Sequence, residues 1–195
     1  MKTKLDAFEE LLQPGKTYRR AELSLFSKSV DRHLQELVRK GALKKLRAGL
    51  YYYPKNSAFG EVPADDHEVI RTFLKDDRFL LTSPNAYNAL GLGTTQLYNK
   101  LVVYNHKRHG EFVLGGRAYD FRVKHHFPCR AVSKEFLLVD LVNNLGQLAE
   151  DQETLLRRVQ EKALTMNATR LKRAVQEFAT TTTKKFFEKT FTNAN

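Results

Sequence analysis

The chain has 195 residues, of which 42% are hydrophobic, so it is long enough to bury one large core or two smaller ones. Its 33 Lys and Arg against 22 Asp and Glu give a formal charge of +11, which favours a polyanionic partner. The single cysteine, Cys129, excludes an intrachain disulfide and a zinc site built from cysteines. No apolar stretch approaches the roughly 20 residues that cross a bilayer, and no apolar signal segment opens the sequence. We therefore expect a cytoplasmic protein without membrane contact.

The excess positive charge is concentrated near the N-terminus. Residues 1 to 60 hold 13 Lys and Arg against 6 Asp and Glu, a net charge of +7. Residues 61 to 128 carry +1 and residues 129 to 195 carry +3. The first third of the chain is therefore the part expected to contact a polyanion.

Three helices are predicted in this first third. Apolar side chains at helical spacing predict one over residues 5 to 12, ending at Pro14-Gly15. Thr17 is expected to cap a second short helix. The third has the clearest pattern, with Ser27 as its expected N-cap and Gly41 as the residue that ends it. Its apolar face is formed by Val30, Leu34, Leu37 and Val38.

A β-hairpin is predicted to follow the helices, with strands over residues 42 to 47 and 50 to 53 around a turn at Gly49. Side-chain alternation in the second strand places Leu50 and Tyr52 in the core. Stacking of the neighbouring tyrosines on unpaired bases is the less favoured alternative. Three helices followed by a basic hairpin predict a winged helix-turn-helix DNA-binding domain over residues 1 to 55.

A second domain is predicted over residues 61 to 195, after the polar segment that contains Pro54, Gly60 and Pro63. Helical patterns cover residues 67 to 74 and 84 to 90, and strand patterns cover residues 79 to 81, 101 to 104, 111 to 114 and 119 to 123. From Ser133 onward the patterns are helical, over residues 136 to 145, 152 to 164, 167 to 178 and 183 to 190. The predicted fold class is α+β: an N-terminal winged helix-turn-helix followed by an α+β domain with a helical C-terminal tail.

Nine residues of the first domain are expected to contact DNA. Four lie off the apolar stripe in the first turns of the third helix, where a recognition helix enters the major groove: Lys28, Ser29, Arg32 and His33. Five lie at the start of the second helix or on the hairpin and are expected to hold phosphates: Arg19, Arg20, Lys44, Lys45 and Arg47. A basic helix that is simply solvated is the alternative, and the order of elements favours DNA binding over it.

No catalytic, cofactor or metal site is predicted, and we expect no enzyme activity. The close acidic pairs are Asp65-Asp66, expected at a helix N-terminus, and Asp76-Asp77, expected to be solvated. The glycines at 91 and 93 do not complete a phosphate-loop motif. The histidines at 106, 109, 125 and 126 have no carboxylate or cysteine at ligand spacing.

The third helix, VDRHLQELVRKG at residues 30 to 41, and the hairpin ending GLYYYP at residues 49 to 54 resemble the AbiEi-type antitoxins of bacterial type IV toxin-antitoxin systems. The resemblance continues through Phe59-Gly60, SPNAYNALGL at residues 83 to 92 and VLGGRAYDF at residues 113 to 121. At Gly93 the family more often has Ser or Thr. The helical tail after Ser133 matches no motif of the family.

This resemblance implies a transcriptional repressor that acts on its own promoter through the N-terminal domain. It also implies neutralisation of a nucleotidyltransferase-like toxin, encoded in the same operon, through the rest of the chain. Binding to an inverted-repeat operator would require a homodimer. The alternatives are an RNA-binding module that depends on Tyr51 and Tyr53, a winged-helix regulator without an antitoxin role, a winged helix used for protein contacts, and an enzyme acting on nucleic acid.

Overall fold

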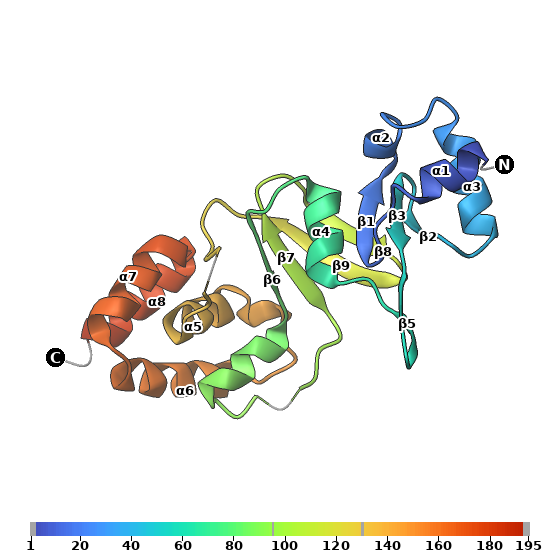
Figure 1. The fold of residues 1–195 in the computed structure, drawn as a ribbon. Helices are drawn as coiled ribbons and strands as arrows, with labels where there is room; N and C mark the ends of the chain where they lie inside the picture. The colour runs from blue at the N-terminus through green and yellow to red at the C-terminus, as the bar shows by residue number, and fades with distance from the viewer. Residues whose placement is uncertain (1–2, 95, 130, 193–195) are drawn as a thin grey trace. The chain divides into compact units, whose positions relative to one another are not determined.

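The computed structural model describes residues 3–94, 96–129 and 131–192 and has a mixed α+β fold (Figure 1). Its strands form one sheet in the order β1-β3-β2, a β4-β5 pair and one sheet in the order β6-β7-β9-β8. The chain divides into two compact units. The first unit contains Met1–Phe79 and Lys107–Phe121, and the second contains Leu80–His106 and Arg122–Asn195. This division differs from the predicted domain ranges of residues 1 to 55 and 61 to 195.

The first unit opens with three helices and a three-stranded antiparallel sheet. In chain order these elements are α1 (Lys4–Glu9), β1 (Lys16–Arg19), α2 (Arg20–Leu23), α3 (Val30–Arg39), β2 (Lys44–Arg47) and β3 (Leu50–Tyr53). Strand β1 was not predicted, and Thr17, expected to cap the second helix, lies in this strand opposite Tyr52. Helix α2 instead begins after Arg19, whose backbone N–H donates to the Glu22 carboxylate at 3.2 Å.

The predicted apolar face of α3 is confirmed as the centre of the N-terminal core. Val30, Leu34 and Leu37 are 4%, 1% and 0% exposed and pack with residues of α1 and α2. The expected N-cap was wrong by two residues, because Ser29 occupies that position. Ser27 lies two residues earlier, where its hydroxyl accepts a hydrogen bond from the Ser29 backbone N–H at 3.1 Å.

The first unit also contains elements from later in the chain. These are the hairpin β4 (Lys55–Ser57) and β5 (Gly60–Val62), helix α4 (Asp66–Leu74), and the antiparallel strands β8 (Gly110–Leu114) and β9 (Arg117–Val123), whose last two residues belong to the second unit. Asp65 caps α4 by accepting a hydrogen bond from the Glu68 backbone N–H. In the glycine turn between β8 and β9, the Gly115 N–H donates to the Leu46 carbonyl at 2.9 Å. This bond ties the turn to strand β2.

The second unit consists mainly of helices packed around a central helix. Its elements are β6 (Phe79–Thr82), whose first residue belongs to the first unit, the 3-10 helix η1 (Pro84–Leu90), β7 (Leu101–Asn105), α5 (Lys134–Asn143), the 3-10 helix η2 (Leu145–Gln147), α6 (Gln152–Thr165), α7 (Ala168–Phe178) and α8 (Thr181–Thr192). Helix α5 is buried on most of its surface, and α6, α7 and α8 pack in the same core (Figure 1). The predicted helical tail is confirmed. Among the described residues, no helix combines the length and apolarity that a membrane span requires.

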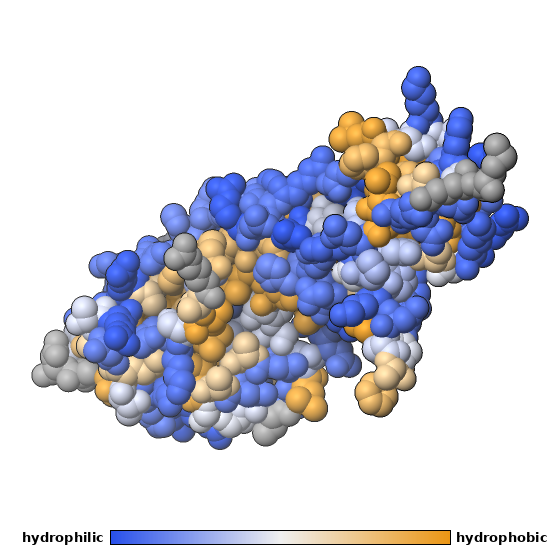
Figure 2. Space-filling model, viewed as in Figure 1, coloured by the Kyte–Doolittle hydropathy of each residue, from blue (hydrophilic) through white to orange (hydrophobic). Residues whose placement is uncertain are grey.

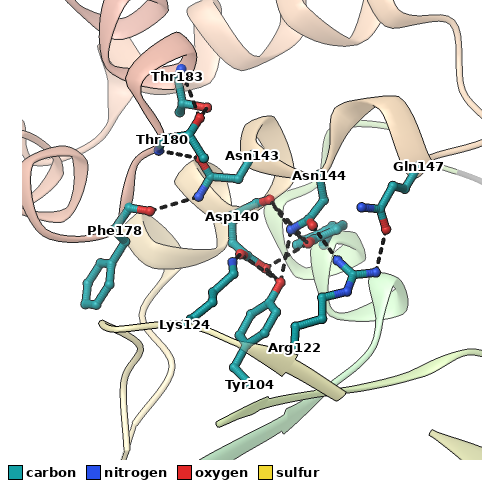
Figure 3. Close-up of polar contacts among 11 residues, drawn as sticks. Tyr104, Arg122, Lys124, Asp140, Asn143, Asn144, Gln147, Phe178, Thr180 and Thr183 are labelled. Atoms are coloured by element: carbon teal, nitrogen blue, oxygen red, sulfur yellow. Dashed lines mark hydrogen bonds and ion pairs between the residues drawn. The ribbon is translucent and has the colours of Figure 1, made fainter. Parts of the chain in front are cut away.

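A polar cluster lies inside this core around the buried Asp140 (Figure 3). Its carboxylate accepts hydrogen bonds from the hydroxyls of Tyr87 at 2.8 Å and Tyr104 at 3.0 Å, and it pairs with the Lys124 ammonium at 3.0 Å. The Asn144 amide donates to both tyrosine oxygens. Burial, together with the nearby carboxylate, raises the pKa of both tyrosines, so the hydroxyls remain protonated donors. Every oxygen of this buried acid therefore has a partner.

Replacing Asp140 with alanine is expected to lower the free energy of unfolding by about 3 kcal/mol, because an ammonium and two hydroxyls lose their partner inside the core. Asp140→Asn keeps one side-chain oxygen as a hydrogen-bond acceptor and should lower the free energy of unfolding by less. Denaturant titration would measure both values. The exposed Asp77 provides the control Asp77→Ala, expected to change stability by less than about 0.5 kcal/mol. Equal stability of Asp140→Ala and this control would contradict the structural role.

The expectation that Asp76 is solvated was wrong, because its side chain is 10% exposed and accepts hydrogen bonds beyond the end of α4. Arg78 donates through its backbone N–H at 3.0 Å and its Nε at 3.2 Å, and the Lys107 ammonium lies at 3.2 Å. These hydrogen bonds, those from Arg78 above all, hold the pKa of Asp76 well below its ordinary value.

A depressed pKa makes the contribution of Asp76 to stability depend on pH. The contribution should be fully present above the unfolded-state pKa of about 3.9 and should disappear as the pH falls through the lower folded-state pKa. Asp76→Asn should therefore be less stable than the native chain at pH 7, with a difference that shrinks below about pH 4. Denaturant titrations at several pH values on both sides of pH 4 would measure this stability difference, with Asp77→Asn as the control. A difference that is constant with pH would contradict the assignment.

Candidate nucleic-acid interface

Helix α3 has two packed flanks and one outward face. On one flank His33 packs against Phe8 of α1, with ring centroids 5.1 Å apart. On the other flank Asp31 accepts two hydrogen bonds from Arg20 of α2, at 2.6 and 2.5 Å. The outward face lies between them, opposite the buried stripe. Figure 2 shows many hydrophilic residues at the end of the molecule that contains α3. Arg32 is exposed on the outward face.

The structure separates the four residues predicted to enter a major groove. Lys28, Ser29 and Arg32 are exposed, and neither Lys28 nor Arg32 has an ion-pair partner within the described ranges. His33 is different, because its ring is half-buried on α1 and its Nδ1 lies 3.2 Å from the Ser27 hydroxyl. Lys28, Ser29 and His33 line one hollow beside α1, and Arg32 is not part of its lining. The structure therefore does not bring all four residues onto one face.

Arg20 is already engaged within the protein. Its hydrogen bonds to Asp31 raise the pKa of the guanidinium and lower that of the carboxyl, so both groups stay charged. Both side chains are largely exposed, so this pair contributes little to stability. Its effect is geometric, because it joins α2 to the first turn of α3. The neighbouring Arg19 is half-buried at the start of α2.

Two of the three hairpin cations also have protein partners. Lys44 pairs with Glu61 of β5 at 2.6 Å. The Arg47 guanidinium lies over the Phe112 ring at 4.9 Å and the Phe73 ring at 5.6 Å. Lys45 is exposed and has no ion-pair partner among the described residues. The sequence could not reveal these contacts because the partners come from β5, α4 and β8, which are distant in the chain.

The three consecutive tyrosines of β3 are packing residues. Tyr52 is 2% exposed and donates to the Val62 carbonyl at 2.8 Å, which confirms the prediction of a core position. Tyr51 and Tyr53 are half-buried against the N-terminal core. Burial is the main cause that raises the pKa of each of these two phenols.

Sequence reasoning missed two exposed residues of α3. Gln35 and Arg39 follow Arg32 by three and seven positions, a spacing that places all three on one helix face. The signal was present, since the same spacing rule identified the buried stripe. The polar residues opposite the buried stripe follow the same helical spacing as the stripe itself.

A pocket of about 210 Å³ lies between strand β2, helix α4 and the β8–β9 turn. Its charged groups already contact one another: Lys44 pairs with Glu61, while Asp66 accepts hydrogen bonds from Arg117 and Tyr119. Across residues 3–94, 96–129 and 131–192, no three His, Cys, Asp or Glu side chains are grouped as metal ligands.

Comparison with known proteins places the chain by fold and by family. The crystal structure of the RV2827C protein from Mycobacterium tuberculosis is similar, with a TM-score of 0.53 and 15% sequence identity. The match covers 88% of this chain and 69% of that one, and it supports the mixed α+β fold. No curated protein sequence matches. The model of DUF6088, a family of unknown function, matches residues 23–171, and the chain therefore belongs to this family.

Proposed function

We propose that residues 1 to 55 form a winged helix-turn-helix that binds double-stranded DNA. The observation that carries the proposal is the element order α1-β1-α2-α3-β2-β3 with the sheet order β1-β3-β2, which we interpret as a winged helix. Helix α3 is the recognition helix in this proposal, because it follows the short α2 and exposes basic side chains. The charge of +7 on residues 1 to 60 supports attraction to a polyanion.

The proposed DNA contacts are made by exposed side chains that are not already paired within the described part of the protein. Lys28, Ser29 and Arg32 enter the major groove, and Lys45 contacts a phosphate from the hairpin. Lys44 and Arg47 contribute mainly by fixing the hairpin within the first unit. Base stacking by Tyr51 and Tyr53 is disfavoured by their packing, so double-stranded DNA is preferred over single-stranded RNA.

We further propose that the protein is a cytoplasmic transcriptional repressor of its own promoter and the antitoxin of a type IV toxin-antitoxin system. This part rests on the resemblance to AbiEi-type antitoxins in residues 30 to 54, 83 to 92 and 113 to 121. The partners would be an inverted-repeat operator, bound by a homodimer, and a nucleotidyltransferase-like toxin encoded beside it. No catalytic step is proposed for the chain itself.

Replacing Arg32 with alanine should weaken binding to a promoter duplex by about 5- to 150-fold, the effect of losing one base contact. Fluorescence anisotropy at fixed salt would measure the affinity. Arg157→Ala is the matched control, because this exposed arginine lies on α6 near Glu153 and Glu161 and should leave binding unchanged. Loss of affinity in both variants alike, or in neither, would contradict the proposed interface.

The antitoxin role predicts that co-expression of this chain restores growth to cells producing the nucleotidyltransferase-like protein encoded next to it. Arg32→Ala should still restore growth, because the proposed neutralisation does not use the DNA-binding face. Asp140→Ala should fail to do so if it unfolds the second unit. Growth arrest that the native chain does not relieve would reject the antitoxin role and leave a regulator.

A further inference from the structure

The outward face of α3 is defined by the stripe that α3 buries, and the half-buried Glu36 lies at one edge of it. Val30, Leu34 and Leu37 are buried, which directs the opposite side of the helix toward solvent. At about 100° per residue, Arg32, Gln35 and Arg39 fall together on that opposite side. All three are exposed.

The flanks of α3 contribute less to this face. His33 is held against Phe8, and Asp31 is held by Arg20. The second contact also matters electrostatically, because an unpaired carboxylate beside the outward face would repel phosphates. Pairing with Arg20 offsets the charge of Asp31.

We propose that Gln35 is a specificity-determining residue that reads adenine in the major groove, beside a guanine read by Arg32; this rests on the proposed DNA binding. A glutamine amide can bond the N6 and N7 atoms of adenine, and an arginine can bond the O6 and N7 atoms of guanine. Three helical residues rise about 4.5 Å, close to the 3.4 Å step between base pairs. Arg32 and Gln35 therefore reach neighbouring base pairs.

Arg39 has a different place in this arrangement. It lies seven residues beyond Arg32, about 10.5 Å along the helix axis, in the last turn of α3. The N-terminal part of a recognition helix approaches the base edges most closely. Arg39 therefore contacts a phosphate, and replacing it should weaken binding to all DNA sequences by the same factor.

The test is selection of bound duplexes from a random pool by the native chain and by two Gln35 variants. The native chain should enrich one adenine next to a guanine. Gln35→Ala should lose the adenine preference at that position by about 5- to 150-fold and keep the other preferences. Gln35→Glu should shift the preference at that position toward cytosine, whose N4 amine donates to a carboxylate.

Gln176→Glu on α7 is the matched control, because it introduces the same charge at another exposed helical glutamine, and it should keep the native sequence profile. If the native chain selects duplexes but both Gln35 variants keep its profile, the role of Gln35 is rejected and DNA binding stands. If the native chain selects no duplex, the inference falls together with the proposed function.

Discussion

The burial of one apolar stripe on α3 is the constraint on which the account of this protein depends. Val30, Leu34 and Leu37 are almost completely buried in the N-terminal core, and that burial fixes the rotation of the helix about its axis. Contacts with α1 and α2 hold the two flanks. The remaining face is therefore determined by packing. Arg32, Gln35 and Arg39 are exposed on it, and Glu36 is half-buried at its edge.

Net charge alone would overstate the cationic surface. Among the residues expected to hold DNA, Arg20 is paired with Asp31, Lys44 with Glu61, and Arg47 lies over two phenylalanine rings. These contacts anchor α2 and the hairpin inside the first unit. Electrostatic attraction brings a polyanion near, whereas specificity depends on the few side chains that packing leaves exposed.

The sequence predicted elements whose own pattern is strong, and it missed those that depend on distant partners. Helix α3 was predicted from its apolar spacing, and the helical tail after Ser133 was predicted in the same way. Strand β1 was missed because residues 16 to 19 show little apolar alternation, and they become a strand by pairing with β3. The hairpin β4–β5 was read as a linker for the same reason.

The candidate site was predicted in part. Lys28 and Arg32 were proposed from their positions, and the structure places Lys28 just before α3 and Arg32 on it, both exposed, whereas the packing of His33 depends on Phe8 in another helix. Asp140 was visible as a single acid inside an apolar helical pattern, and that signal was not used. Its partners, Tyr87, Tyr104 and Lys124, come from separate segments that no local pattern connects.

The most direct measurement is binding of the purified protein to a duplex from its own promoter and to a scrambled duplex of equal length, over a series of salt concentrations. Non-specific phosphate contacts weaken steeply as salt rises, whereas base contacts keep their discrimination. The account predicts a preference for the promoter that persists at raised salt. Equal binding to both duplexes at every salt concentration, or binding to neither, would contradict it.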